Sequence, residues 1–206
     1  MNSGRTNACL GTLLLLAAGA AGAADLDSLL QSLAREPPQT IAFVEANRSA
    51  LLEHDLVVSG VLEYPAKGRL SRVVVEPYRE RTDIDGSEVR IRREGKPERR
   101  FSLRRSAELG GLLSAFSALL AGDRAALEVS FEPAVEFRPD GWQLDLVPRQ
   151  AGRQDRVGKV RVQGTGDEPA CIAVMMRDGS VATRILLGAA ADDPSTGGCD
   201  WVPLEE

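Results

Sequence analysis

Histidine and aromatic residues are scarce in this 206-residue sequence. There is a single histidine, His54, and only 4% of the residues are aromatic. A Ser-His-Asp or Cys-His enzyme would have to use His54, yet no nucleophile motif surrounds it. The sequence also lacks a Cys/His metal cluster and a glycine-rich phosphate loop that follows a strand. We therefore expect no catalytic residue, no metal and no other cofactor, and we interpret His54 as a surface residue.

An excess of positive charge is also lacking. The chain has 25 Lys and Arg against 30 Asp and Glu, a formal net charge of −5, which gives no whole-protein case for nucleic acid binding. Two carboxylates suffice for a glycosidase, but a pair such as Asp83 and Asp85 flanks a predicted turn and is better explained by turn chemistry and solubility. We therefore expect that the protein is not an enzyme.

No hydrophobic run is long enough to span a bilayer. The apolar stretch from Leu10 to Ala18 is shorter than the roughly 18 residues that a transmembrane helix needs. Arg5 before this stretch and the small residues Ala21 to Ala23 after it are typical of a cleavable secretory signal. We predict that residues 1–23 are removed on export and that residues 24–206 form a single domain, with an uncleaved anchor as the alternative.

Cysteine is rare as well, with Cys9, Cys171 and Cys199 the three in the chain. Cys9 precedes the apolar run, whereas a lipoprotein cysteine would follow it, so we expect Cys9 to be discarded with the signal. In an oxidising compartment, the two remaining cysteines suggest one disulfide. A Cys171–Cys199 disulfide would tie the C-terminal tail to a strand, and two buried thiols are the alternative.

The hydrophobic pattern predicts many strands and two helices. Leu26, Leu29, Leu30 and Leu33 recur at helical spacing, and the period then changes to two. Alternation predicts strands at residues 56–64, 69–75, 89–91, 101–103, 127–132, 142–146, 159–163, 171–176 and 181–187. We therefore predict a mainly β fold with helices (α+β), in which a strongly curved antiparallel sheet forms an incomplete barrel.

The second predicted helix, from Ala107 to Ala121, has an unusual composition. No charged residue occurs between Glu108 and Asp123, although a surface helix normally shows a polar face. Its large apolar residues are Leu109, Leu112, Leu113, Phe116, Leu119 and Leu120. The helix is too short to cross a bilayer, so it is either buried on both sides or is a lid whose apolar side faces a cavity.

Basic residues gather between Arg90 and Arg105. This segment has seven arginines and Lys96 against two glutamates, a local charge of +6. Arginine docks phosphate groups or acidic protein surfaces, and a solvated hairpin face is the alternative. Single charges on a solvated face contribute little stability, so folding alone does not demand the cluster. The candidate residues for docking a partner are Arg92, Arg93, Arg99 and Arg100.

Several short motifs follow one another in a characteristic order. They are Phe43-Val44-Glu45, Gly60-Val61-Leu62-Glu63-Tyr64, Leu70-Ser71-Arg72, Val75-Glu76-Pro77 followed by Asp85-Gly86, Trp142 to Pro148 with its Leu-x-Pro ending, and Asp178-Gly179. In this order, over most of the chain, they resemble the periplasmic outer-membrane lipoprotein carriers, the LolA-like family, of which this sequence looks like a divergent branch.

The resemblance implies an incomplete antiparallel barrel covered by helices, with a hydrophobic cavity that shields acyl chains in the periplasm. The cargo would be an acylated lipoprotein or another lipid, and the partners an inner-membrane extraction complex and an outer-membrane acceptor. Such a transport chaperone would act as a monomer. Each buried CH₂ contributes about 0.8 kcal/mol, so a multiply acylated cargo cannot cross water unaided at a useful rate. A non-transport, lipid-sensing or protein-interaction domain on the same fold is the alternative.

The resemblance also points to candidate site residues. We expect the lipid cavity to be lined by Leu62, Tyr64, Leu70, Val74, Leu109, Leu112, Leu113, Phe116, Leu119, Leu120, Phe131, Trp142, Leu144 and Leu146. The family's turn usually carries an Arg-Pro pair whose arginine helps to govern cargo release. Here the turn reads Pro65-Ala66-Lys67-Gly68-Arg69, so Lys67 and Arg69 are the candidates for this role.

Overall fold

The computed structural model describes residues 18–48, 54–103, 115–149 and 156–193. The predictions made for Cys9, Leu109, Leu112, Leu113 and Cys199 lie outside these described residues.

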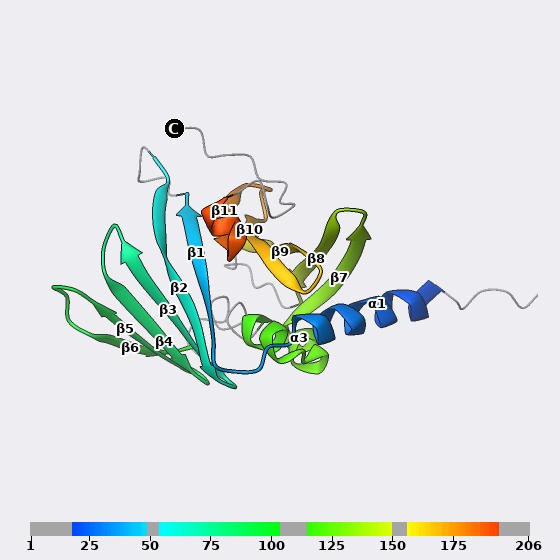
Figure 1. The fold of residues 1–206 in the computed structure, drawn as a ribbon, viewed down its shortest axis with the longest axis horizontal. Helices are drawn as coiled ribbons and strands as arrows, with labels where there is room; N and C mark the ends of the chain where they lie inside the picture. Colours follow the sequence, from blue (N-terminus) through cyan, green and yellow to red (C-terminus); the bar gives the residue numbers. More distant parts are fainter. Residues whose placement is uncertain (1–17, 49–53, 104–114, 150–155, 194–206) are drawn as a thin grey trace, which may run out of the picture.

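Eleven antiparallel strands form a single curved sheet in the order β6-β5-β4-β3-β2-β1-β11-β10-β9-β8-β7. The sheet bends into a trough, which stays unclosed because its two edge strands, β6 and β7, do not pair with each other (Figure 1). The strands are β1 (Gln39–Asn47), β2 (Leu56–Ala66), β3 (Arg69–Glu76), β4 (Glu80–Asp85), β5 (Glu88–Arg93), β6 (Arg99–Ser102), β7 (Phe131–Arg138), β8 (Gly141–Pro148), β9 (Val157–Thr165), β10 (Glu168–Met176) and β11 (Val181–Leu187). The predicted fold class is confirmed.

Helix α1 (Ala18–Leu33) fills part of the concave side of this sheet. The predicted leucine stripe is buried there, since each of its four side chains is at most 5% exposed. They join one core cluster with Phe43 from the middle of the sheet and Leu144 from near its β7 end. The four leucines of the stripe are Leu26, Leu29, Leu30 and Leu33.

The strand register sorts side chains onto a concave and a convex face. Directly opposite residues of an antiparallel pair share a face, and Gly60 of β2 lies opposite Phe43 of β1 and Val74 of β3. Phe43 and Val74 are 2% and 1% exposed, so this row belongs to the buried concave face. A Cβ at Gly60 would lie 1.9 Å from a backbone carbonyl oxygen of β3, where the register shifts, so only glycine fits.

One predicted strand is wrong over most of its length. Residues 124–130 form helix α3 (Arg124–Ser130), and strand structure begins only at Phe131. The Asp123 side chain caps this helix by accepting a hydrogen bond from the Ala126 backbone N–H at 2.9 Å. The supposed alternation is also absent, because Leu127 is 0% exposed and Val129 is 76% exposed. The N-cap therefore decides the local structure.

The helix at residues 115–121 runs directly into α3. It ends in a Schellman motif, in which the N–H groups of Gly122 and Asp123 donate to the carbonyl groups of Leu119 and Ala118. Gly122 has φ of +64°, and a Cβ there would lie 3.0 Å from the Leu30 carbonyl oxygen. Glycine at this position therefore permits both the helix end and the close approach of this segment to α1.

The convex face is held partly by ion pairs between neighbouring strands. Asp145 of β8 accepts hydrogen bonds from Lys159 at 3.0 Å and from Arg161 at 2.8 Å, both on β9. Burial alone would raise the pKa of the Asp145 carboxyl, but the hydrogen bonds from the two cations outweigh burial and hold this pKa below its usual value. The folded protein is thus stabilised by the ionised form of Asp145.

Leu144 at the centre of this core gives a test of its packing. We expect Leu144→Ala to lower the free energy of unfolding by about 2–5 kcal/mol, because it removes buried methyl groups and leaves a cavity. Val147→Ala on the same strand is the control, since Val147 is 42% exposed, and it should change stability by less than about 0.5 kcal/mol. Urea unfolding measures both, and equal effects would contradict the assigned core.

Asp145 also makes stability depend on pH. Its pKa is lower in the folded than in the unfolded chain, so its contribution is complete above the unfolded pKa of about 3.9 and is lost as the pH falls through the folded pKa. We expect Asp145→Asn to cost about 1–3 kcal/mol at neutral pH and progressively less below pH about 4. Urea unfolding over this pH range measures the difference. The control Asp140→Asn, in an exposed turn, should show no such trend.

Candidate functional site

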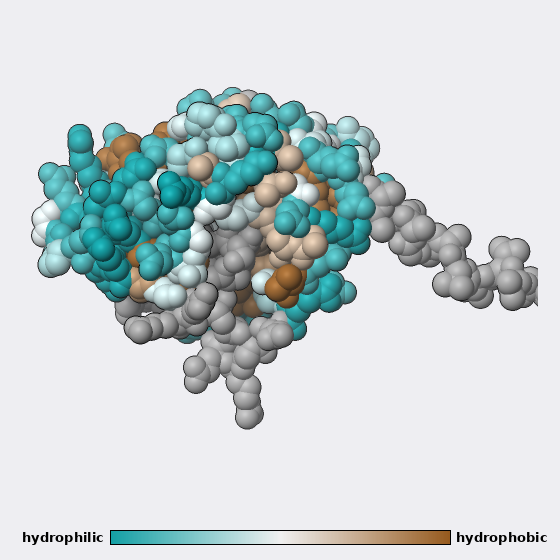
Figure 2. All heavy atoms as spheres, turned by 90° about the horizontal axis from the view of Figure 1, so that it is seen from below, coloured by the Kyte–Doolittle hydropathy of each residue, from teal (hydrophilic) through white to brown (hydrophobic). Residues whose placement is uncertain are grey.

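A cavity of about 460 Å³ lies between the concave face of the sheet and the helices. Its walls come from the end of α1, the helix at residues 115–121, strands β1, β2, β3 and β11, the β9–β10 hairpin end, and the start of α4 (Ala189–Asp192). The large apolar lining residues are Leu33, Ile41, Leu62, Tyr64, Leu70, Phe116, Leu120 and Leu187. Seen from below, apolar residues gather in the middle of the molecule while hydrophilic residues cover its ends (Figure 2).

Polar groups complete the lining of this cavity, and Arg35 is the best fixed of them. The Arg35 guanidinium donates to the Ser32 carbonyl oxygen at 2.9 Å and forms an ion pair with Asp167 at 3.4 Å. Its backbone N–H donates to the Leu120 carbonyl oxygen at 2.9 Å. Arg35 therefore joins α1, the helix at residues 115–121 and the β9–β10 turn beside the cavity.

The predicted lining residues divide into two groups. Leu62, Tyr64, Leu70, Phe116 and Leu120 surround the cavity. A second group is packed in the closed core cluster that includes the leucines of α1. Its members are Val74, Leu119, Phe131, Trp142, Leu144 and Leu146. A role for either group in holding lipid stays a prediction.

Sequence reasoning missed three large apolar residues of the cavity wall, namely Leu33, Ile41 and Leu187. Leu33 ends the predicted leucine stripe and Leu187 ends a predicted strand, so both were recognised as apolar but were not assigned to the cavity. Their approach to Leu62 depends on β1 pairing with both β2 and β11. This pairing joins segments from the two ends of the chain, and no local pattern reveals it.

The described part of the uncharged helix contacts both the core and the cavity. Ala115, Ala118 and Leu119 are buried in the main core cluster. Phe116 and Leu120 are only partly buried, pack against a second cluster around the β3–β4–β5 strands, and line the cavity. The described part of this helix therefore has one side packed against the core and another side on the cavity, and its role as a lid stays a prediction.

The turn between β2 and β3 lies beside the same cavity. The register shifts between Glu63 and Ala66, so Pro65 falls in a bulge, as expected for a residue without a backbone N–H. Lys67 pairs with Glu36 at 3.7 Å, and Arg69 pairs with Asp85 at 3.1 Å, with all four side chains at least 60% exposed. Exposed ion pairs of this kind contribute little stability.

Charged side chains also meet on the concave face. Arg72 of β3 donates two hydrogen bonds to Glu45 of β1, at 2.9 and 2.8 Å, and lies 3.8 Å from Glu80 of β4. Its guanidinium carbon is 5.1 Å from the centre of the Phe43 ring. Gly60 of β2, between these strands, has no side chain to block the approach. Arg72 is therefore neutralised and links three strands.

The four docking-candidate arginines do not share one face. Arg92 and Arg100 point to the convex face, where they pair with Asp83 and Glu98, respectively. Arg93 lies on the other face, with its guanidinium 3.7 Å from the centre of the Tyr78 ring. Arg99 lies opposite Ile91 on that same concave face. Alternation along the strands separates the cluster into two sets.

The remaining candidate residues add no second site. Cys171 is buried, but Cys199 lies outside the described residues, so their pairing stays a prediction. His54 is exposed. Within the described ranges, no group of three His, Cys, Asp or Glu side chains is placed to hold a metal ion. Among the helices that the structure describes, none combines the length and hydrophobicity needed to cross a membrane.

Comparison with solved structures finds similar chains at low sequence identity. A LolA superfamily protein from Nitrosomonas europaea is 11% identical, with a TM-score of 0.42 over 81% of this chain and 90% of that one. The MucA/MucB complex from Pseudomonas aeruginosa gives 14% identity and a TM-score of 0.42 over 87% of this chain and 67% of that one. LprF from Mycobacterium bovis is 11% identical, with a TM-score of 0.38 over 90% of this chain and 98% of that one.

Sequence comparison supplies the family. None of the curated proteins matches this chain significantly. A family model described as outer membrane lipoprotein carrier protein LolA-like matches residues 18–199, which is most of the chain. That span includes every strand of the sheet and the cavity between the sheet and its helices. The chain therefore belongs to the LolA-like family of outer membrane lipoprotein carrier proteins.

Proposed function

We propose that this protein is a periplasmic carrier that shields acyl chains of lipoproteins, or of a related lipid, during transfer between the inner and outer membranes. The observation that carries this proposal is the cavity of about 460 Å³ between the concave face and the helices, with its apolar walls. The function requires binding and release but no chemical step. An inner-membrane extraction complex and an outer-membrane acceptor would supply and receive the cargo.

The make-up of the cavity suits an amphipathic cargo. Its large apolar residues come from α1, the helix at residues 115–121 and four strands, while Arg35, Glu63 and Glu168 add polar groups to the lining. An alkyl chain in the cavity gains about 0.8 kcal/mol for each buried CH₂, and a polar headgroup can remain beside the polar groups. Such a site binds by shape and hydrophobicity and tolerates different cargo chemistry.

The size of the cavity limits what it can hold. Its volume lies in the lower half of the roughly 300–1,000 Å³ that is typical of small-molecule sites. A cargo with several acyl chains needs more room than this. We expect the helix at residues 115–121 to move away from the sheet on binding, because Phe116 and Leu120 of this helix form one wall.

A lipid-sensing or protein-interaction domain is the second candidate. The turn between β2 and β3 lacks an Arg-Pro pair, and Lys67 and Arg69 are held in exposed ion pairs. A sensor would bind lipid in the same cavity without passing it on. Movement of a fluorescent acylated peptide from donor to acceptor vesicles distinguishes the two, because a carrier accelerates this transfer and a sensor does not.

Two substitutions on the same strand test the cavity. We expect Leu62→Glu to weaken binding of an apolar fluorescent dye or a fluorescent fatty acid at least about tenfold, because it places a carboxylate in the apolar wall. Val57→Glu is the matched control, since Val57 is 49% exposed on the convex face of β2. Fluorescence titration measures the affinities, and thermal unfolding checks that both variants fold.

A bulky apolar substitution, Leu62→Trp, provides a second test that introduces no charge. It fills the cavity and should also lower dye binding. If the unmodified protein binds neither dye nor fatty acid, or if Leu62→Glu, Leu62→Trp and Val57→Glu all bind as well as the unmodified protein, the cavity is not the lipid site.

A further inference from the structure

The β5–β6 hairpin concentrates positive charge at one edge of a negatively charged protein. Residues 88–102 have six basic and three acidic side chains, a net charge of +3, whereas the whole chain has −5. All six basic side chains are exposed. Strand β6 has four residues and is the last strand on its side of the sheet, so the hairpin projects from the end of the trough (Figure 1).

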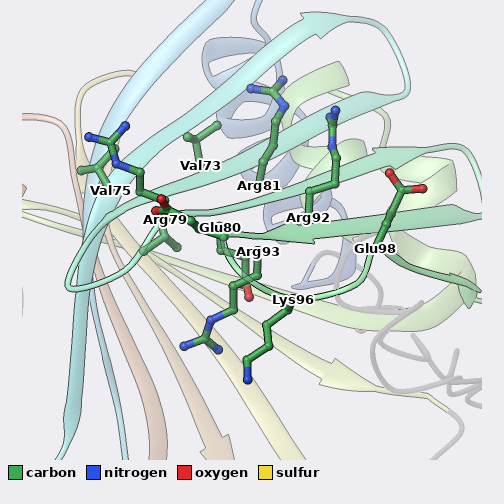
Figure 3. Close-up of a pocket in the computed structure, with 11 residues that line it drawn as sticks. Val73, Val75, Arg79, Glu80, Arg81, Arg92, Arg93, Lys96 and Glu98 are labelled. Atoms are coloured by element: carbon green, nitrogen blue, oxygen red, sulfur yellow. The ribbon is translucent and has the colours of Figure 1, made fainter.

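These cations occupy both faces and the tip of the hairpin. The strand register places Arg90, Arg92 and Arg100 on the convex face, with Arg90 directly opposite Arg100. Arg93 and Arg99 lie on the concave face, and Lys96 is in the connecting turn. Figure 3 shows Arg92 directed to one side of the hairpin and Arg93 and Lys96 directed to the other.

The two faces differ in how their charges are compensated. On the convex face, Arg92 pairs with Asp83, and Arg90 and Arg100 both pair with Glu98. The basic side chains on the concave face and at the tip lack such partners among the described residues. No ion pair joins Arg93, Arg99 or Lys96 to any residue in the described part of the chain. These three cations are therefore available to an external anion.

A pocket of about 560 Å³ lies beside the tip of this hairpin and the turn between β3 and β4. Val73 and Val75 supply apolar surface, and Arg79, Arg93 and Lys96 supply positive charge around it (Figure 3). Three carboxylates, those of Glu80, Glu94 and Glu98, also line the pocket. Val75 is 53% exposed. The end of the trough thus combines three cations that form no ion pair within the described residues with the exposed side chain of Val75, which is the combination that an anionic headgroup layer can satisfy.

We infer that the β5–β6 hairpin docks this protein on anionic lipid bilayers through the phosphate groups of the lipid headgroups. The position of the uncompensated cations on the concave face and at the tip favours a bilayer over an acidic protein, because mobile headgroups can rearrange around a projecting tip. Mobile headgroups can surround both faces and the tip. This inference goes beyond the carrier proposal, since it concerns the membrane surface and does not require acyl cargo.

The charge balance also explains why such docking would be reversible and oriented. At physiological salt the Debye length is about 8 Å, so a bilayer in contact with the hairpin attracts it strongly while repulsion from the remaining, net acidic part of the chain is largely screened. The exposed cations remain hydrated, so binding weakens as salt rises. A protein that must leave one membrane for another needs contacts of this kind.

Vesicle binding by the full chain tests the inference. The probes are phosphatidylcholine vesicles with and without phosphatidylglycerol, sedimented at low and at high salt. A basic residue near an anionic surface strengthens binding about fivefold, so we expect Arg93→Gln/Lys96→Gln to weaken binding to the anionic vesicles about 25-fold. The matched control is Arg156→Gln/Arg177→Gln, which removes two exposed charges from the other half of the sheet and should bind like the unmodified protein.

Each outcome of this experiment decides the inference. Salt-sensitive binding that needs phosphatidylglycerol and is lost only in the hairpin variant supports it. Absence of binding to anionic vesicles, equal loss in both variants, or binding to soluble polyglutamate without binding to vesicles overturns it, and the last result indicates an acidic protein partner. Dye binding in the cavity should be unchanged in both variants, which separates failure of this inference from failure of the carrier proposal.

Discussion

The concave face of an unclosed sheet must be covered, and the rest of this structure depends on how that is done. Eleven strands curve into a trough whose inner side chains are apolar. Because buried apolar area is the main source of stability, an open trough would not persist in water. Helix α1 covers one half with four leucines. The helix at residues 115–121 covers the other half incompletely, and the uncovered remainder is the cavity.

Glycines and polar side chains determine how closely the helices pack against each other and how charged side chains meet on the sheet. Gly122 ends one helix against the backbone of α1, and Arg35 joins α1 to the same helix and to the β9–β10 turn. On the sheet, the absence of a side chain at Gly60 leaves room for Arg72 to reach Glu45 across β2. The contacts of Gly122 and Arg35 hold the helix that borders the cavity against α1, while that helix buries only one side fully. A helix that is fully buried on one side only is suitable for the wall of a cavity that has to open.

The predictions from sequence succeeded for most strands, including short ones such as β5, and failed where a helix cap competed with an apparent alternation. The leucine stripe of α1 and the alternation of β2, β3 and β8 are sustained, and the structure confirms them. At residues 127–132 only three apolar residues supported a strand, and the Asp123 cap together with the Arg124–Glu128 ion pair favoured a helix instead. Similarly, the arginines of residues 92–100 looked like one cluster, although strand alternation places them on two faces.

The sequence by itself determined the fold class, the apolar identity of most cavity residues and the concentration of positive charge near residues 90–105, since these follow from local period and composition. Only the tertiary structure decided which apolar residues form closed core and which face the cavity. Trp142 and Leu144 look no different in sequence from Leu62 and Tyr64. The first two lie under α1, and the others lie beyond its end. The physical reason is that a strand residue is buried by a helix distant in the chain. The residues next to it in the sequence do not reveal whether that helix lies over it.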